Sequence, residues 1–224
     1  MKKSIFLILA VLIAAGCVSE QTDTRHVVGF YNLENLFDTI DDPRKNDEDF
    51  LPDGYNRWTE DKYQEKLGNM AEVIYRMAEE NGRYHSVLGV CEVENRKVLE
   101  DLTAHETIAE ADFEIVHHEG PDGRGIDVAL LYRPSQFKVL ETEPIPYTFE
   151  GSSIDFEMSR NDRKNFRTRD ILMVRGLIGD EMFAFYVAHL PSRGGDKPGG
   201  YQLRDRGGEI MYDHACELME KYPG

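Results

Sequence analysis

The stretch from Ser86 to Asn95 constrains the fold most, because an uninterrupted apolar run ends there in acidic and amide side chains. Residues 87–91 form a short apolar run with β-branched members, which is typical of a strand buried on both faces. Glu92 follows this run directly. A carboxylate beside a buried strand is costly unless something pairs with it. Glu92 therefore either reaches solvent at the strand end or is held by a metal ion or by backbone donors.

An amphipathic helix is predicted before this strand. Thr59 is a suitable N-cap and Gly82 can end the helix. Between them, apolar residues recur at spacings of four and three and form one buried stripe: Tyr63, Leu67, Met70, Ile74 and Met77. With an earlier strand over residues 27–31, this pattern favours two parallel strands joined by a right-handed crossover.

The rest of the chain predicts two more helices and five more short strands. The helices are expected over residues 96–111 and 202–222, and the polar segment 148–168 is expected to be an exposed connection. Turn residues separate the strands, which are expected at residues 113–117, 126–132, 137–140, 171–178 and 182–190. We expect the first three of these strands to form an antiparallel meander and the last two to form a hairpin.

The N-terminal residues predict a targeting segment. Two lysines precede an apolar stretch that is too short to span a bilayer. The small residues directly before Cys17 resemble the lipobox of bacterial lipoproteins, which implies cleavage before Cys17 and lipidation of its thiol. An ordinary secretory signal is the alternative. We therefore expect a signal peptide over residues 1–17, a polar tether over 18–26 and a domain over 27–224, anchored by lipid to a membrane of the bacterial cell envelope.

Composition limits the partners of the chain. The 42 acidic residues exceed the 26 basic ones, which gives a formal net charge of −16. Nonspecific attraction to nucleic acid needs clustered lysine and arginine, and the sequence has no long basic run. If the substrate is a polyanion, local arginines or bound cations would have to overcome the electrostatic repulsion that the net negative charge of the chain produces. Cys91 and Cys216 are far apart in the sequence and are expected to be free, buried thiols.

Four predicted strands carry a polar residue at or beside an end, namely Asn32, Glu92, Arg169 and His189. In α/β folds ligands bind where such ends meet, and we expect these four residues to share one rim of a sheet. Carboxylate and amide oxygens suit Mg²⁺, Mn²⁺ or Ca²⁺, and arginine offers a planar fork for phosphate oxygens. Histidine can move a proton to or from a reacting oxygen. Each residue alone is commonly structural, but together they supply the functions that phosphate-ester hydrolysis needs.

Five motifs, in this order, resemble the endonuclease/exonuclease/phosphatase superfamily, which includes the pancreatic-type deoxyribonucleases. The motifs are FYNLENLF (30–37), GVCEVEN (89–95), RGIDVALLYR (124–133), TRD (168–170) and AHLPSR (188–193). The resemblance spans about residues 27–222 and implies a mixed-sheet α/β sandwich of the deoxyribonuclease-like type, in which two packed sheets carry flanking helices. Cys91 departs from the family, which often has glutamine before the metal-binding glutamate.

The resemblance also implies roles for individual residues. Glu92 would be the metal-binding carboxylate, with Mg²⁺ (or Mn²⁺ or Ca²⁺) as cofactor, and Asn32 would help to position the scissile phosphate or the metal. Arg169 would contact the phosphate and His189 would protonate the leaving oxygen, while Arg124 falls near a substrate-contacting position. The implied function is a metal-dependent phosphoesterase, a nuclease or phosphodiesterase, acting by water attack on a nucleic acid, a nucleotide or a phospholipid head group.

The C-terminal region departs from the family pattern. The motifs Gly-Asp-x-Asn and Ser-Asp-His of the family's last third do not occur, and Asp213-His214, in the middle of a predicted helix, is the nearest substitute. We therefore expect the N-terminal two thirds of a longer enzyme, or a truncated gene product, with an incomplete sandwich and little activity of its own. The alternative function is a non-catalytic envelope lipoprotein that uses the same fold as a binding module.

Overall fold

The computed structural model describes residues 25–192 and 200–223. The strands within this part are β1 (Val28–Leu36), β2 (Val87–Val93), β3 (Glu114–His117), β4 (Asp127–Tyr132), β5 (Lys138–Ile145), β6 (Ile171–Ile178) and β7 (Glu181–Val187). The α-helices are α1 (Glu60–Asn81), α2 (Arg96–Ala104), α3 (Arg160–Asn165) and α4 (Gly200–Lys221).

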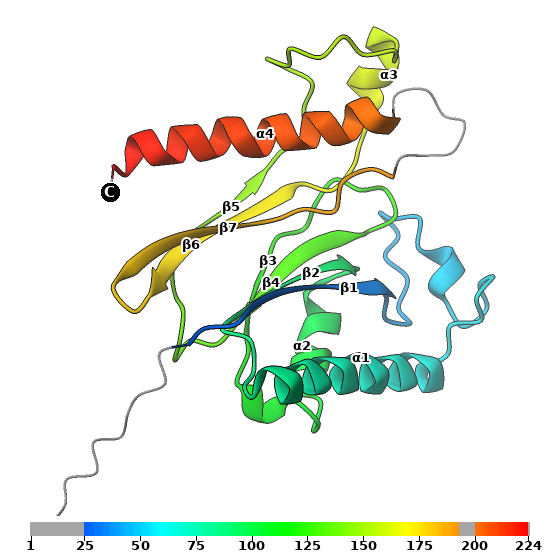
Figure 1. Ribbon diagram of the computed structural model, residues 1–224. Coiled ribbons are helices and arrows are strands. Elements are labelled where there is room, and N and C mark those ends of the chain that lie inside the picture. The colour runs from blue at the N-terminus through cyan, green and yellow to red at the C-terminus, as the bar shows by residue number, and fades with distance from the viewer. Residues whose placement is uncertain (1–24, 193–199, 224) are drawn as a thin grey trace, which may run out of the picture.

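The strands form two sheets that pack against each other. One sheet has the order β1-β2-β4-β3 and the other has the order β5-β6-β7. In Figure 1, α1 and α2 cover one face of the four-stranded sheet, the three-stranded sheet lies against its other face, and α4 forms the outer layer over the three-stranded sheet. The predicted arrangement of two packed sheets with flanking helices is confirmed.

The four-stranded sheet is mixed. β1 and β2 are parallel, with Val28 opposite Val87, and α1 lies in the connection between them. β4 pairs antiparallel with β2 on one side and with β3 on the other. The predicted pair of parallel strands joined by a helix is therefore confirmed.

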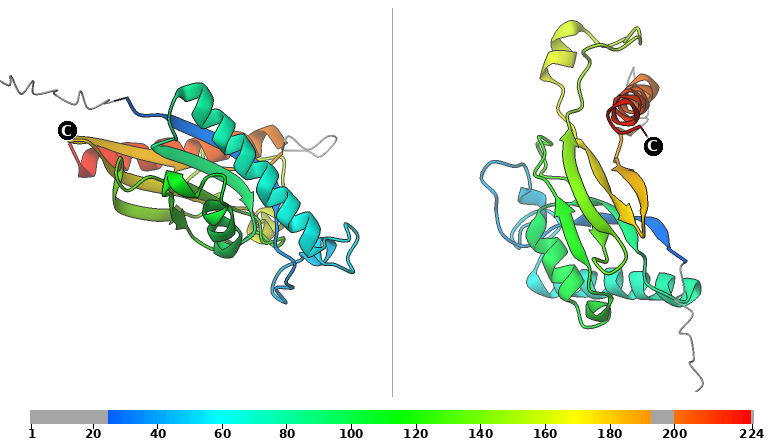
Figure 2. Two further views of the ribbon diagram at one scale, coloured as in Figure 1. Left: turned by 90° about the horizontal axis from the view of Figure 1, so that it is seen from below. Right: turned by 90° about the vertical axis from the view of Figure 1, so that its left-hand side faces the viewer.

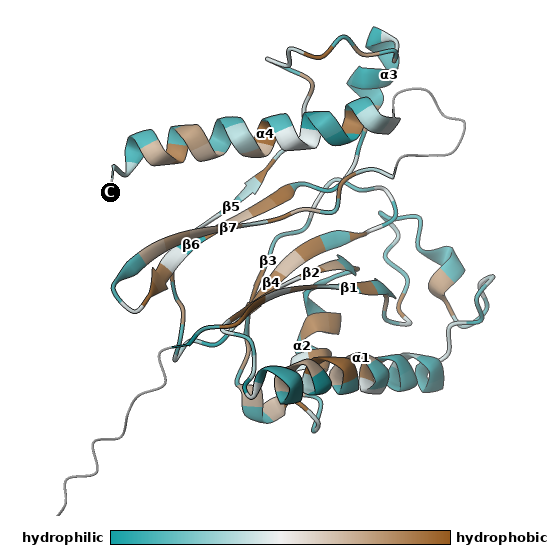
Figure 3. Cartoon of the chain, in the orientation of Figure 1, coloured by the Kyte–Doolittle hydropathy of each residue, from teal (hydrophilic) through white to brown (hydrophobic). Residues whose placement is uncertain are grey.

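α1 closes the outer face of this sheet. It ends at Gly82, whose φ of 70° is a left-handed conformation that glycine adopts without strain. Full burial of each large apolar side chain contributes roughly 1.5–3 kcal/mol. The helix buries one stripe of side chains against the sheet, consisting of Tyr63, Leu67, Ala71, Ile74 and Ala78. Figure 3 shows that the side of α1 turned away from the sheet is largely hydrophilic.

A second apolar core lies between the two sheets, which face each other in Figure 2. Phe137 is fully buried there, and its ring packs edge-on against Tyr132 of β4 and Phe185 of β7, at centroid distances of 5.9 and 5.4 Å. Gly89 of β2 lies so close to Val187 of β7 that a Cβ atom would be 3.2 Å from the valine side chain. This close packing sets the last residue of β7 against the interior of β2.

The predicted antiparallel meander is wrong at its third strand. β3 and β4 pair as predicted, but β5 pairs with β6 in the other sheet. The turn after β4 explains the difference, because Arg133 N–H donates to Ser86 O and Phe137 N–H donates to Arg133 O. This turn places Phe137 between the sheets, and the chain then continues in the second sheet. Turn residues mark the break in the sequence without indicating which strand comes to lie beside the next one.

Two predicted segments have different structures. α2 ends at Ala104, short of the predicted residue 111, because His105 is extended with a φ of −60° and a ψ of 132°. The His105 ring then accepts the Thr107 N–H at 3.3 Å, and a short 3-10 helix follows at Ala109–Ala111. Within the predicted connection 148–168, α3 forms because Ser159 caps its N-terminus by accepting the Asp162 N–H.

The predicted signal peptide, its Cys17 and most of the predicted tether lie outside the described residues. Among the helices of the described part, none is both long and apolar enough to cross a membrane. Cys91 and Cys216 are free thiols, as predicted, although only Cys91 is fully buried.

Candidate active site

A cavity of about 850 Å³ opens where the two sheets and α4 meet. β1 and β2 contribute its carboxylate and amide, whereas the segments beside β6 and β7 contribute a guanidinium and an imidazole. Its described lining consists of Phe30, Asn32, Cys91, Glu92, Arg124, Arg169, Tyr186, Ala188, His189, Leu190, Ser192, Arg204 and Met211.

Glu92 faces this cavity because β2 carries a bulge. The pairing register with β4 shifts between Cys91 and Val93, and Glu92 has a left-handed φ of 60°. In an unbroken strand, side chains alternate, and Glu92 would point into the helix-side core with Val90. The bulge instead places Val93 in that core and leaves Glu92 on the cavity side. The left-handed backbone costs about 1–3 kcal/mol, a kind of strain that is common at functional sites.

Asn32 lies on β1 beside Glu92 and orients its carboxylate. The Asn32 Nδ2 donates to Glu92 Oε1 at 3.0 Å, and the Asn32 Oδ1 accepts the Glu34 N–H at 2.7 Å. The amide oxygen is therefore already bonded to the backbone. In this arrangement Asn32 positions Glu92.

His189 approaches Glu92 from the opposite sheet. It follows β7, and its Nε2 lies 3.3 Å from Glu92 Oε1. Burial lowers the pKa of His189 below its ordinary 6.5, and the nearby Arg169 guanidinium lowers this pKa further, while Glu92 acts in the opposite direction. The neutral imidazole is therefore favoured at neutral pH, and a neutral imidazole has one nitrogen that donates and one that accepts.

Arg169 fixes the backbone of His189. Its Nε and Nη2 donate to the His189 carbonyl oxygen at 3.1 and 2.7 Å, and its Nη1 donates to Asp122 Oδ2 at 3.1 Å. These contacts use three of the five N–H groups of a guanidinium. The remaining N–H groups are available to an anion in the cavity, which Arg169 lines.

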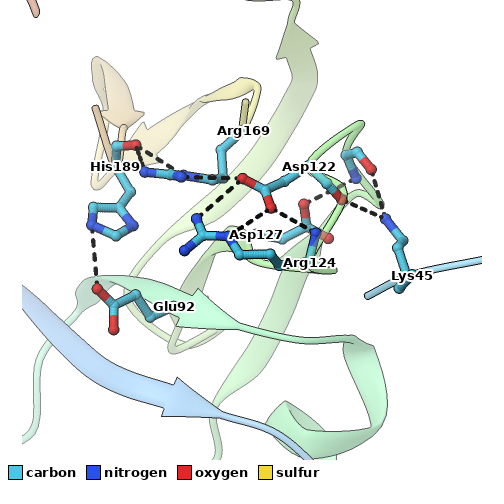
Figure 4. Close-up of polar contacts among 8 residues, drawn as sticks. Lys45, Glu92, Asp122, Arg124, Asp127, Arg169 and His189 are labelled. Atoms are coloured by element: carbon cyan, nitrogen blue, oxygen red, sulfur yellow. Dashed lines mark hydrogen bonds and ion pairs between the residues drawn. The ribbon is translucent and has the colours of Figure 1, made fainter. Parts of the chain in front are cut away.

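Asp122 joins two arginines of the site, as Figure 4 shows. Its Oδ1 accepts the Arg124 backbone N–H at 2.9 Å, and its Oδ2 accepts from Arg169. Burial acts to raise the pKa of Asp122, but the hydrogen bonds from Arg124 and Arg169 outweigh it and lower the pKa below its ordinary 3.8. Sequence reasoning missed this role because the Pro-Asp-Gly segment is an ordinary turn signal.

The structure places all the cavity residues suggested by the sequence around one space, namely Asn32, Glu92, Arg124, Arg169 and His189. The expectation that they share a rim of one sheet is wrong, because Arg169 and His189 flank strands of the second sheet.

Arg204 of α4 also lines the cavity, although its sequence context does not distinguish it from a solvent-exposed helical arginine. His214, the nearest substitute in the sequence for the Ser-Asp-His histidine, is not among the described cavity residues. It contacts the Tyr186 hydroxyl at 2.9 Å and Glu143 at 3.3 Å.

The charge of the cavity is opposite to the charge of the chain. The whole chain has 42 acidic and 26 basic residues. Among the described lining residues, however, three arginines and a histidine surround one carboxylate, that of Glu92. Guanidinium groups match the planar spacing of phosphate oxygens, so this lining suits a phosphate-bearing anion.

The cavity also fits one divalent cation. Glu92 supplies a carboxylate that Asn32 holds in place, and the surrounding space can admit water and substrate oxygens. Mg²⁺ is usually held in this way, by one or two carboxylates together with water and phosphate oxygens. The donor set therefore fits a cation that shares its coordination with the substrate.

Comparisons with known proteins agree with this architecture. A family model described as Endonuclease/Exonuclease/phosphatase family matches residues 27–223. A search of the curated proteins found no match. Among solved structures, a mannosyl-6-phosphatase from Bacteroides thetaiotaomicron is 16% identical with a TM-score of 0.52, over 89% of this chain and 62% of that one.

Two further solved structures have the same fold. An endonuclease/exonuclease/phosphatase family protein from Bacteroides thetaiotaomicron is 16% identical with a TM-score of 0.51, over 87% of this chain and 57% of that one. Its counterpart from Bacteroides vulgatus is 15% identical with a TM-score of 0.50, over 85% of this chain and 59% of that one. The chain thus spans 57% to 62% of the length of these three structures.

Proposed function

Since the chain belongs to the endonuclease/exonuclease/phosphatase family, we propose that its cavity hydrolyses phosphate esters with a divalent cation, Mg²⁺ or Mn²⁺, as cofactor. Enzymes of this family are hydrolases acting on phosphate esters, and they typically use divalent metals. Our proposal takes the hydrolysis of phosphate esters from the family. The ion, the substrate and the residue roles below are proposed for this chain alone.

One observation carries the proposal. Glu92 from the first sheet and His189 from the second meet at 3.3 Å, in a cavity whose other charged residues are arginines. A carboxylate, an imidazole and guanidinium groups around one space supply a cation ligand, a proton carrier and anion binders. A structural ion pair would not require this concentration of arginines in a chain of net charge −16.

Each residue has a distinct task in this proposal. The free N–H groups of Arg169 and the exposed guanidinium of Arg124 bind the non-bridging phosphate oxygens. His189 in its protonated form gives the proton on Nε2 to the leaving oxygen as the ester bond breaks and returns to the neutral imidazole, while Asn32 keeps Glu92 oriented. Glu92 would hold the cation, which when bound supplies positive charge to the phosphate oxygens and lowers the pKa of bound water.

The substrate in this proposal is a phosphodiester or a small phosphomonoester. The negative charge of the chain opposes long-range attraction of extended polyanions, which favours small esters over long nucleic acids. One solved structure with this fold is named a mannosyl-6-phosphatase, so sugar phosphates belong in the substrate panel.

The test is hydrolysis of DNA, RNA, bis-p-nitrophenyl phosphate, p-nitrophenyl phosphate and a sugar phosphate, mannose 6-phosphate, with Mg²⁺ or Mn²⁺. We expect weak turnover that requires the cation, and losses of about 100-fold or more in Glu92→Ala and in His189→Ala. His118→Ala is the matched histidine control, because its ring contacts Thr142 outside the cavity lining. Unchanged rates in both site variants would refute the assignment.

The alternative, a non-catalytic lipoprotein that binds a phosphate ester in the same cavity, predicts a different outcome. Binding of a phosphate ester would then weaken in Arg169→Ala, while no divalent cation supports turnover of any ester. The two functions are separated by measuring binding and hydrolysis on the same preparation.

We also propose that the chain is a lipoprotein of the bacterial cell envelope, anchored through Cys17. The proposal rests on the basic and apolar leader with small residues before Cys17. Incorporation of labelled fatty acid into the wild type, but not into Cys17→Ala, would support it. Equal labelling of both proteins would refute it.

A further inference from the structure

A second cluster of metal-ligating side chains lies outside the cavity. His117 is the last residue of β3, Asp127 is the first residue of β4, and Glu119 lies in the loop between them. One ligand atom from each side chain can be chosen so that all three lie within 4.8 Å of one another. Because β3 and β4 are paired antiparallel neighbours, the sheet itself holds His117 and Asp127 close together.

Two atoms of this cluster are buried without hydrogen bonds in the described part of the protein. They are His117 Nε2 and Asp127 Oδ2, on side chains that are each only 3% exposed. Buried polar atoms are nearly always satisfied, and an exception calls for an explanation such as an ion. The two atoms are 3.4 Å apart, beyond the usual range of an N–H···O hydrogen bond.

The electrostatic surroundings also favour a cation. Asp127 uses its other oxygen, Oδ1, to accept the Gly120 N–H at 3.0 Å. Glu119 and Asp127 bring two carboxylates to one place beside the His117 imidazole. Lys45 donates its ammonium hydrogens to the Gly120 and Asp122 carbonyl oxygens, at 3.0 and 3.3 Å.

The spacing identifies the chemical class of the cation. An imidazole nitrogen with carboxylate oxygens is a typical ligand set for Zn²⁺ and related transition-metal dications. Ligand atoms about 2.0–2.1 Å from a tetrahedral ion are roughly 3.3 Å apart, close to the observed separation of His117 Nε2 and Asp127 Oδ2. Glu119 is exposed, and its side chain can rotate to complete the set.

We propose that His117, Glu119 and Asp127 bind one zinc-type dication, with water as the fourth ligand. This site is separate from the Glu92 site and does not depend on the proposed hydrolase function. The metal would tie together the two ends of the loop that carries Asp122 and Arg124. Its bound state would therefore stabilise the segment that positions Arg169.

The test is a titration of the full chain, first stripped with a chelator, with Zn²⁺ in competition with a chromophoric chelator. We expect one equivalent in the wild type and an affinity lower by at least about tenfold in Glu119→Gln. Glu119 is exposed, so this substitution should leave the fold intact. His118→Ala, which alters the neighbouring histidine, and Glu92→Gln, which alters the other site, should both retain the wild-type affinity.

Cobalt provides a second readout that identifies the ligands. Co²⁺ bound by nitrogen and oxygen alone should give visible d–d bands without a thiolate charge-transfer band, and His117→Asn should abolish these bands. A thiolate band would instead assign the metal to a cysteine. Absence of Zn²⁺ binding in the wild type, equal affinity in Glu119→Gln, or loss of the equivalent in Glu92→Gln would each overturn the proposal.

Discussion

Two helices of 22 residues each, α1 and α4, cover the two sheets in different ways. α1 buries aromatic, aliphatic and alanine side chains against the four-stranded sheet. α4 buries only two large apolar side chains, Leu203 and Ile210, together with two glycines and the guanidinium of Arg206. One sheet is therefore closed by an apolar layer, and the other is covered by a helix that polar contacts hold in place.

The polar contacts of α4 reach the segment before α3. Arg206 donates to the carbonyl oxygens of Thr148 and Glu150 at 2.7 Å each, and Glu209 accepts the Ser153 backbone N–H at 3.0 Å. The site lies between the apolar half and the polar half of the molecule, and takes Glu92 from the first and His189 from the second. The difference suggests that the apolar half supplies a rigid frame, while charged contacts position the groups that approach it.

The largest expected effect tests the apolar half. Ile74→Ala removes a fully buried side chain of α1 and should lower the free energy of unfolding by about 2–5 kcal/mol. The matched substitution in α4, Ile210→Ala, should cost less than half as much, because α4 packs against a thinner apolar layer. Urea denaturation of both variants and the wild type gives the two values.

The matched pair can also break the comparison. Equal losses in Ile74→Ala and Ile210→Ala would show that α4 is held by apolar burial to the same degree as α1. The distinction between an apolar frame and a polar cover would then have to be abandoned.

The next effect concerns the contact between the halves. Asp122→Asn removes the charge that Arg169 and Arg124 share, and should lower the free energy of unfolding by about 1–3 kcal/mol at neutral pH. The folded-state pKa of Asp122 lies below its ordinary 3.8. The stabilisation by this carboxylate is therefore fully present above that value and is lost as the pH falls through the folded-state pKa.

The measurement is urea denaturation of wild type and Asp122→Asn from pH 7 down to pH 3. The difference between them should be largest near neutral pH and should shrink below about pH 4, as Asp122 in the wild type takes up its proton. A difference that stays constant over this range would show that the charge of Asp122 does not hold the loop.

Asp122 also marks the limit of what sequence reasoning could find. The strands near the site were predictable because apolar runs and the turn residues between them are local features of the sequence. The polar residues at the ends of those strands predicted Glu92 and His189 as residues of the site. A buried turn aspartate looks the same in sequence as a solvated one, and only tertiary contacts reveal that Asp122 bonds two arginines.

Non-local pairing explains the other differences. Residues 137–140 carry the pattern of a strand, but the packing of Phe137 between the sheets determines that β5 pairs with β6. The orientation of Glu92 depends in the same way on a bulge between β2 and β4. Period-two alternation cannot predict a bulge, because the register that it interrupts is a property of the paired strands.

The smallest expected effect tests the polar cover alone. The Glu209 carboxylate accepts from Ser152, Ser153 and Arg206, and these hydrogen bonds lower its pKa to about 2. Glu209→Gln should expose the segment 148–157 to faster proteolysis at pH 6 while leaving the global unfolding midpoint nearly unchanged.

Because the folded-state pKa of Glu209 is depressed, the stabilisation that its carboxylate contributes is present above its ordinary pKa of 4.5 and is lost as the pH falls toward 2. Hydrogen exchange of residues 148–157 should therefore differ between wild type and variant at pH 6, and the difference should shrink as the pH falls toward 2. Identical exchange at pH 6 would mean that the Arg206 contacts hold this segment to α4 without Glu209.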